Sequence, residues 1–93
     1  MRVYKEVVKR DGRVVPFDQQ KIEDAIAQAW NQIGYPDFDS IANLSVLIAN
    51  EVSDRATVRE IENTVMSILF QHVPDVAREY CSYKMERERA RNA

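Results

Sequence analysis

Strand-forming residues cluster at the start of the chain and predict a β-hairpin over residues 3–16. The cluster consists of Val3, Tyr4, Val7, Val8, Val14 and Val15. Asp11 and Gly12 separate its two halves, and this pair favours a two-residue turn because both positions tolerate a positive φ. Such a turn predicts that Val8 faces Val15 across the hairpin.

Apolar residues then recur at the helical period, which predicts a first helix. The apolar stripe consists of Ile22, Ala25, Ile26, Ala29, Trp30 and Ile33. Asp18 is the expected N-cap, because its carboxylate can accept hydrogen bonds from the N–H groups of the first turn. Gly34 is expected at the C′ position, where a residue in the left-handed conformation ends the helix.

Two further stripes predict a second helix, which starts near Asp39 or Ser40, and a third helix after a short connection over residues 53–56. Thr57 and Glu60 fit a capping box at the start of the third helix, in which each side chain accepts from the other residue's backbone N–H. The apolar positions are Ile41, Leu44, Leu47, Ile48 and Val52, and then Val58, Ile61, Val65, Ile68 and Leu69.

Pro74 suits the first turn of a fourth helix, which carries a few apolar residues and then becomes highly charged. The order of elements predicts an α+β fold, with an N-terminal β-hairpin packed on a bundle of about four α-helices. With 93 residues, the chain is expected to form one domain over residues 1–93.

Composition narrows the classes of function. A single cysteine, Cys81, allows no intramolecular disulfide, and with a single histidine, His72, it argues against a zinc site or a Cys/His catalytic pair. No apolar run reaches the ~18 residues of a membrane span, and no signal-peptide pattern is present, so a cytoplasmic protein without a membrane partner is expected. The glycine-rich phosphate-binding loops GxxxxGK[ST] and GxGxxG are also absent.

Charge is distributed unevenly although the net charge is only −2. Residues 1–21 hold six bases against three acids, residues 22–77 hold two against nine, and residues 78–93 hold five against three. Two basic ends predict a local anion site if they meet in space, and the alternative is that both ends are simply solvated. The low pI of about 5.4 argues against autonomous binding of nucleic acid.

Cations occur where a phosphate could be bound without a glycine-rich loop. Lys9 and Arg10 precede the hairpin turn, and Lys21 lies in the first turn of the first helix, where the helix dipole also favours anions. Three more cations follow one face of the last helix at i, i+3 and i+7, namely Lys84, Arg87 and Arg91. The alternative for this face is a solvated surface paired with Glu86 and Glu88.

Two segments resemble the ATP-cone domain, and the likeness covers roughly residues 5–91. The opening is similar in the runs Val8-Lys9-Arg10-Asp11-Gly12-Arg13, Val15-Pro16-Phe17-Asp18 and Lys21-Ile22. The run Val76-Ala77-Arg78-Glu79-Tyr80-Cys81-Ser82-Tyr83-Lys84 resembles the closing helix of the family, and residues 58–65 resemble the helix before it.

The resemblance implies a non-catalytic regulatory module that binds ATP or dATP, with Mg²⁺ as the accompanying ion, and no catalytic cofactor. In this family the module lies at the N-terminus of ribonucleotide reductase large subunits, including the anaerobic type. There it controls overall activity in deoxyribonucleotide synthesis, often through a change of oligomer. The implied partners are a nucleoside triphosphate, the rest of the reductase and other cone domains.

Two alternatives remain open from the sequence. The family also occurs in a bacterial repressor of reductase genes, whose zinc ribbon this chain lacks because Cys81 is its only cysteine. A nucleotide-independent interaction module is the other alternative, with Trp30 or Phe38 as the apolar anchor.

Carried over by motif, the resemblance implies a nucleotide site in which the basic residues hold the phosphates and residues 15–18, especially Phe17, form the wall under the hairpin. Its members are Val8, Lys9, Arg10, Val15, Phe17, Asp18, Lys21, Ile22, Thr57, Lys84, Arg87 and Arg91. Val15 stands where the family often has a polar or acidic residue, and Lys84 lacks the planar fork of the usual arginine. Thr57 is offset by about one residue from the family's usual hydroxyl. We therefore expect the basic ends to converge on one polyphosphate and the acidic middle to face outward.

Overall fold

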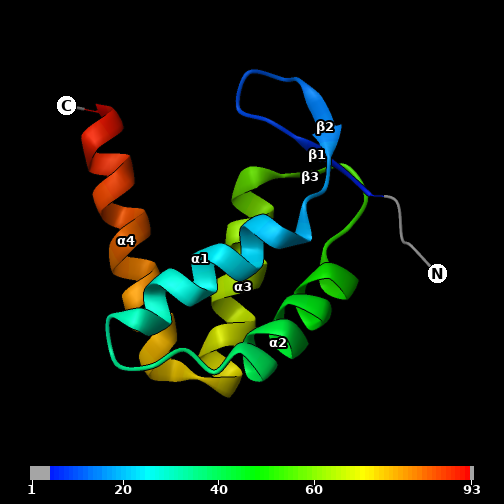
Figure 1. Ribbon diagram of the computed structural model, residues 1–93. Coiled ribbons are helices and arrows are strands. Elements are labelled where there is room, and N and C mark those ends of the chain that lie inside the picture. The colour runs from blue at the N-terminus through cyan, green and yellow to red at the C-terminus, as the bar shows by residue number, and fades with distance from the viewer. Residues whose placement is uncertain (1–4, 93) are drawn as a thin grey trace.

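The computed structural model describes the backbone of residues 5–92, and the side chains of these residues except those at positions 87, 88, 91 and 92. A small sheet lies over the N-terminal ends of two of the four helices (Figure 1), which confirms the expected α+β fold. The elements in chain order are β1 (Glu6–Val8), β2 (Val14–Pro16), α1 (Gln19–Asn31), α2 (Phe38–Glu51), β3 (Ala56–Thr57), α3 (Val58–His72) and α4 (Pro74–Asn92).

The hairpin turn is one residue longer than expected. The Lys9 N–H donates to the Arg13 carbonyl at 2.7 Å, and the Gly12 N–H donates to the Lys9 carbonyl at 2.9 Å, so three residues form the loop. Gly12 has a φ of 90°, which suits a three-residue loop that ends on a residue with positive φ. Val8 therefore pairs with Val14, and the predicted pairing of Val8 with Val15 is wrong.

A third strand completes the sheet where the sequence indicated only a connection. β3 pairs in parallel with β1, so the strand order is β2-β1-β3. Arg55 turns the chain into β3 with a φ of 61°, and its N–H donates to the Glu6 carbonyl at 2.9 Å. The Glu6 N–H in turn donates to Asp54 Oδ1 at 3.0 Å. β3 has only two residues, which are too few for an alternating apolar pattern to predict it from the sequence.

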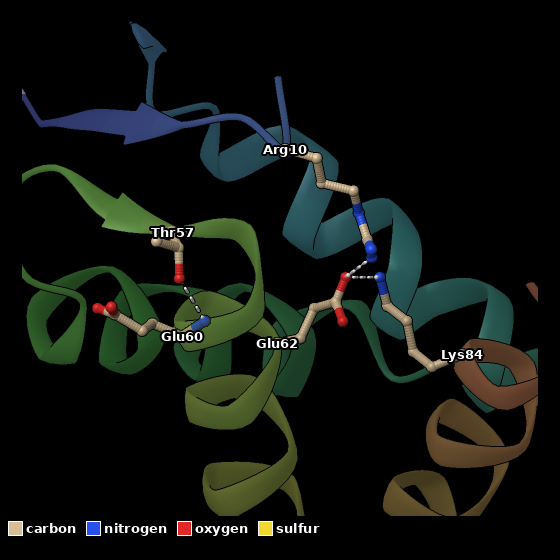
Figure 2. Close-up of polar contacts among 5 residues, drawn as sticks. All are labelled: Arg10, Thr57, Glu60, Glu62 and Lys84. Atoms are coloured by element: carbon tan, nitrogen blue, oxygen red, sulfur yellow. Dashed lines mark hydrogen bonds and ion pairs between the residues drawn. The ribbon is translucent and has the colours of Figure 1, made fainter. Parts of the chain in front are cut away.

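Side-chain caps fix the starts of the first three helices. Asp18 accepts from the Gln20 N–H at 3.0 Å, as expected. α2 starts at Phe38, close to the expected start near Asp39 or Ser40, and its N-cap is Asp37. Thr57 Oγ1 accepts from the Glu60 N–H at 3.1 Å, which is the Thr57 half of the expected capping box. Figure 2 shows no contact between the carboxylate of Glu60 and Thr57.

The end of α1 differs from the prediction. The helix ends at Asn31 with Gln32 as C-cap, and the Gln32 and Ile33 N–H groups donate to the Ala29 and Trp30 carbonyls at 3.2 and 3.0 Å. Gly34 lies beyond the C′ position with a φ of 158°, so its predicted role as a left-handed stop residue is wrong. Instead, these two hydrogen bonds of the 3₁₀ type, each to the carbonyl three residues earlier, satisfy carbonyl groups at the end of the helix.

The core lies between the four helices and reaches the sheet through β3. Its fully buried side chains include Ile26 of α1, Ile48 of α2, and Leu69 of α3. The C-terminal end of α4 extends past the other helices (Figure 1). None of the helices, over the residues described, has both the length and the apolar content needed to cross a membrane.

Lys5 connects the first strand to the end of α2. Its ammonium donates to the Ala49 and Val52 carbonyls, both at 2.6 Å, where the last carbonyls of α2 have no partner within the helix. A cation at a helix C-terminus also interacts favourably with the helix dipole. This contact and the β1–β3 ladder fix the hairpin against the helices.

Candidate nucleotide-binding site

A pocket of about 170 Å³ lies between the hairpin and the N-terminal turns of α1 and α3. Its lining consists of Val7, Lys9, Val15, Pro16, Phe17, Asp18, Lys21, Ile22, Val58, Ile61 and Glu62. Six of the twelve candidate residues are therefore gathered around one space: Lys9, Val15, Phe17, Asp18, Lys21 and Ile22. The observed hairpin register matters here, because it pairs Val15 with Val7 at the edge of this pocket.

Two lysines and two carboxylates form the charged part of the pocket lining, namely Lys9, Lys21, Asp18 and Glu62. Lys9 and Lys21 both line the pocket, one from the end of β1 and the other from the first turn of α1. Val58 is the first residue of α3, so the N-terminal ends of two helices border the same space. Helix N-termini carry unpaired N–H groups and the positive end of the helix dipole, and both attract phosphate oxygens.

Two further candidate cations, Arg10 and Lys84, meet on one carboxylate at the edge of this site. Glu62 Oε1 lies 2.8 Å from Lys84 Nζ and 4.0 Å from an Arg10 guanidinium nitrogen (Figure 2). The Glu62 side chain is 13% exposed, whereas that of Arg10 is 54% exposed. Lys84 Nζ also lies 5.6 Å from the centre of the Tyr80 ring, within the range of a cation–π interaction.

This cluster brings the two basic ends of the chain together on α3. Arg10 comes from the hairpin loop and Lys84 from α4, 74 residues later in the chain. The alternative of a solvated face does not hold for Lys84, because its ammonium donates to Glu62 of α3 and its side chain is only 21% exposed. The expectation that the acidic middle faces outward is wrong for Glu62, which turns toward the site.

Two candidate residues, Val8 and Thr57, have other positions. Val8 and Thr57 pair across the β1–β3 ladder, next to the pocket but not among its lining residues. The Thr57 hydroxyl accepts the capping hydrogen bond of α3. The side chains of Arg87 and Arg91 lie outside the described part of the chain.

Similarity to known proteins agrees with this geometry. The family model of the ATP cone domain matches residues 5–89. The chain belongs to the ATP-cone family. It is 34% identical to the vitamin B12-dependent ribonucleoside-diphosphate reductase of Thermoplasma acidophilum over 94% of its own length, and 31% identical to the anaerobic ribonucleoside-triphosphate reductase of Salmonella typhimurium over 88%. The chain spans 12% of each of these relatives.

The sequence alone missed four lining residues of this ATP-cone pocket: Val7, Val58, Ile61 and Glu62. Val58 and Ile61 belong to the apolar stripe of α3, and position within such a stripe does not separate core residues from pocket walls. Glu62 lies in the acidic middle of the chain, and its only signal is that it directly follows the apolar position Ile61 on a helix whose start borders the site.

Proposed function

We propose that this ATP-cone domain binds ATP or dATP under the hairpin. The observation that carries the proposal is the convergence of four cations, Lys9, Arg10, Lys21 and Lys84, around one small pocket. Charge-assisted hydrogen bonds from such side chains are the strongest available to a phosphate. Membership of the ATP-cone family supports the nucleotide as the ligand.

The pocket holds one part of the nucleotide and its rim holds the other. A volume of about 170 Å³ is below the ~300 Å³ typical of a site that encloses a whole small-molecule ligand. Val15, Phe17 and Ile22 would contact the base or ribose, with Val8 and Thr57 beside them. Lys9 and Lys21 would bind the first phosphates, and Arg10, Lys84, Arg87 and Arg91 the outer ones, with Mg²⁺ accompanying the triphosphate.

Regulation of a ribonucleotide reductase is the role we propose for this site. Both relatives carry the name of such a reductase, and the chain matches about an eighth of each. Residues 1–93 would form one non-catalytic domain that controls overall activity, with the exchange of ATP for dATP changing contacts to the rest of the reductase or to other cone domains. No catalytic cofactor enters this proposal.

Calorimetry with ATP and dATP tests the binding step. The wild-type chain should bind both nucleotides, and Lys9→Ala combined with Lys21→Ala should abolish binding while the helical circular dichroism stays unchanged. Absence of binding at millimolar nucleotide would overturn the proposal.

An interaction module is the second candidate, and exposed aromatic side chains favour it. Phe38 is 69% exposed and Tyr35 is 97% exposed around the connection from α1 to α2, whereas Trp30 packs against the core. Size-exclusion chromatography separates the two functions. An oligomer that forms equally with and without dATP favours the interaction module, and an oligomer that depends on dATP favours the regulatory domain.

A further inference from the structure

Glu62 already holds two of the cations that the nucleotide would need. Its carboxylate lies 2.8 Å from Lys84 Nζ and 4.0 Å from Arg10, and it lines the pocket under the hairpin (Figure 2). The side chains of Glu62 and Lys84 are only 13% and 21% exposed. Salt and water screen a pair so withdrawn from solvent less than they screen a surface ion pair.

We propose that Glu62 is an internal competitor of the polyphosphate, and that effector binding transfers Lys84 and Arg10 from Glu62 to the phosphate oxygens. This inference rests on the nucleotide-binding function proposed above. A carboxylate and a polyphosphate repel each other, so they do not share these two cations without a cost in free energy. Glu62 therefore weakens binding of any ligand that must reach Lys84 and Arg10.

Competition of this kind makes the site selective for the number of phosphates. A ligand with a single phosphate would be held by Lys9 and Lys21 and would leave the Glu62 pairs intact. A triphosphate extends to Arg10 and Lys84 and has to replace those pairs. Glu62 would thus set the concentration of triphosphate at which the domain responds, without setting the affinity for a monophosphate.

The same exchange connects binding to the arrangement of the helices. The Glu62–Lys84 pair joins α3 to α4 (Figure 2). The Arg10 contact joins the hairpin loop to α3. When both cations turn to the phosphates, the hairpin and α4 become linked through the nucleotide instead of through α3. A ligand can shift a conformation only through such a difference in contacts between two states.

Glu62→Gln tests the competition, because it keeps the shape of the side chain and removes the charge. Titration calorimetry should show ATP and inorganic tripolyphosphate binding about three- to tenfold more tightly to this variant, as expected for the loss of a partly buried ion pair. The affinity for AMP should stay within about twofold of the wild-type value. Glu60→Gln is the matched control, because it removes the same charge from the same helix and the Glu60 carboxylate lies away from the cluster (Figure 2). The affinities of this variant for all three ligands should equal those of the wild type.

Each result supports or overturns the proposal. Equal or weaker binding of tripolyphosphate by Glu62→Gln, while the wild type binds ATP, overturns the competition and leaves the nucleotide site standing. A loss of ATP affinity that appears only with Mg²⁺ also overturns it, because Glu62 would then be a metal ligand. Failure of the wild type to bind ATP overturns the proposed function itself. If Glu62→Gln does not fold, Glu62→Asp retains the charge on a shorter side chain, and a smaller gain in affinity is the supporting result.

Discussion

The helical body and the hairpin end of the molecule are held together by different interactions. In the body, Ile26, Ile48 and Leu69 are completely buried against one another's helices. In the hairpin, over the residues described, only Val7 of the two strands is buried, and polar contacts do most of the joining: Lys5 to α2 and Glu6 to Asp54. Apolar packing thus defines the body, while the hairpin end keeps charged side chains around a partly open pocket.

This difference predicts that stability and nucleotide binding can be changed separately. Removal of a buried methyl group in the body lowers the free energy of unfolding and leaves the pocket unchanged. Removal of a cation at the hairpin end lowers affinity and leaves the core unchanged. A substitution that alters both quantities by similar amounts contradicts the separation.

The largest effect is expected from Leu69→Ala in the body. Leu69 is 0% exposed, so its truncation leaves a cavity and should lower the free energy of unfolding by about 2–5 kcal/mol. Leu47→Ala is the matched control, because the same atoms are lost from a side chain that is 43% exposed, and its cost should stay below about 1 kcal/mol. Urea denaturation followed by circular dichroism measures both values. An equal loss in the free energy of unfolding for the two variants would show that Leu69 is no more important to the core than the half-exposed Leu47.

The next effect is expected at the hairpin end. Lys9→Gln should weaken ATP binding by about ten- to hundredfold, because a charged hydrogen bond contributes about 1.5–3 kcal/mol. Its free energy of unfolding should remain that of the wild type. Arg78→Gln removes the same charge from the first turns of α4, where Arg78 is 3.6 Å from Asp75 and does not line the pocket, so ATP affinity should not change. Calorimetry at one salt concentration compares the two variants, and an equal loss from both would indicate nonspecific attraction.

The two regions also differ in how much the sequence could predict. The sequence predicted the apolar stripes of the helices, the Asp18 and Thr57 caps and the start of α4 at Pro74, because periodicity and capping are local properties. Two features of the hairpin end could not be read in this way. The register depends on whether Gly12 ends a two- or a three-residue loop, and both loops accept the same residues. β3 exists because β1 pairs with it from 49 residues earlier in the chain.

The contacts within the candidate site were also only partly predictable from local sequence patterns. Spacing placed Lys84 on one helical face with Arg87 and Arg91, and the family likeness connected this face to Lys9 and Arg10. The partner of Lys84 could not be predicted, because Glu62 is one of nine acids in the middle of the chain and only tertiary packing distinguishes it. Burial of a charged side chain depends on its neighbours in space, which a single sequence does not specify.

A smaller effect is expected at the junction of the two regions, where Thr57 caps α3. Thr57→Ala should lower the free energy of unfolding by about 1 kcal/mol, because the Glu60 N–H loses its acceptor. Thr64→Ala provides the comparison on the same helix. The Thr64 hydroxyl donates to the Glu60 carbonyl at 3.0 Å, but this carbonyl already accepts a backbone hydrogen bond within the helix. Alanine also has a higher helix propensity than threonine, so the free energy of unfolding should change little. Thr57→Ser should restore the wild-type value, and failure to do so would assign the loss to packing of the methyl group.

The smallest effect is expected in the loss of stability at low pH, and it arises at Asp37, the N-cap of α2. The hydroxyl and the N–H of Ser40 hold the pKa of Asp37 below its usual value of 3.8. The charged cap is therefore favoured in the folded state: its contribution is fully present above about pH 3.8 and is lost as the pH falls through the lower folded pKa. Asp37→Asn keeps a capping acceptor without a titrating group, so its unfolding free energy should decline less than that of the wild type between pH 5 and pH 2. Ser40→Ala removes the donor 2.8 Å from Asp37 Oδ2 and should reduce the same decline. Urea denaturation at each pH measures the free energy of unfolding of the three proteins. A parallel loss of stability in all three would contradict this explanation, because the acid sensitivity would then arise from other carboxylates. Asp11 in the hairpin loop is one such group, since the Arg13 N–H and guanidinium lower its pKa.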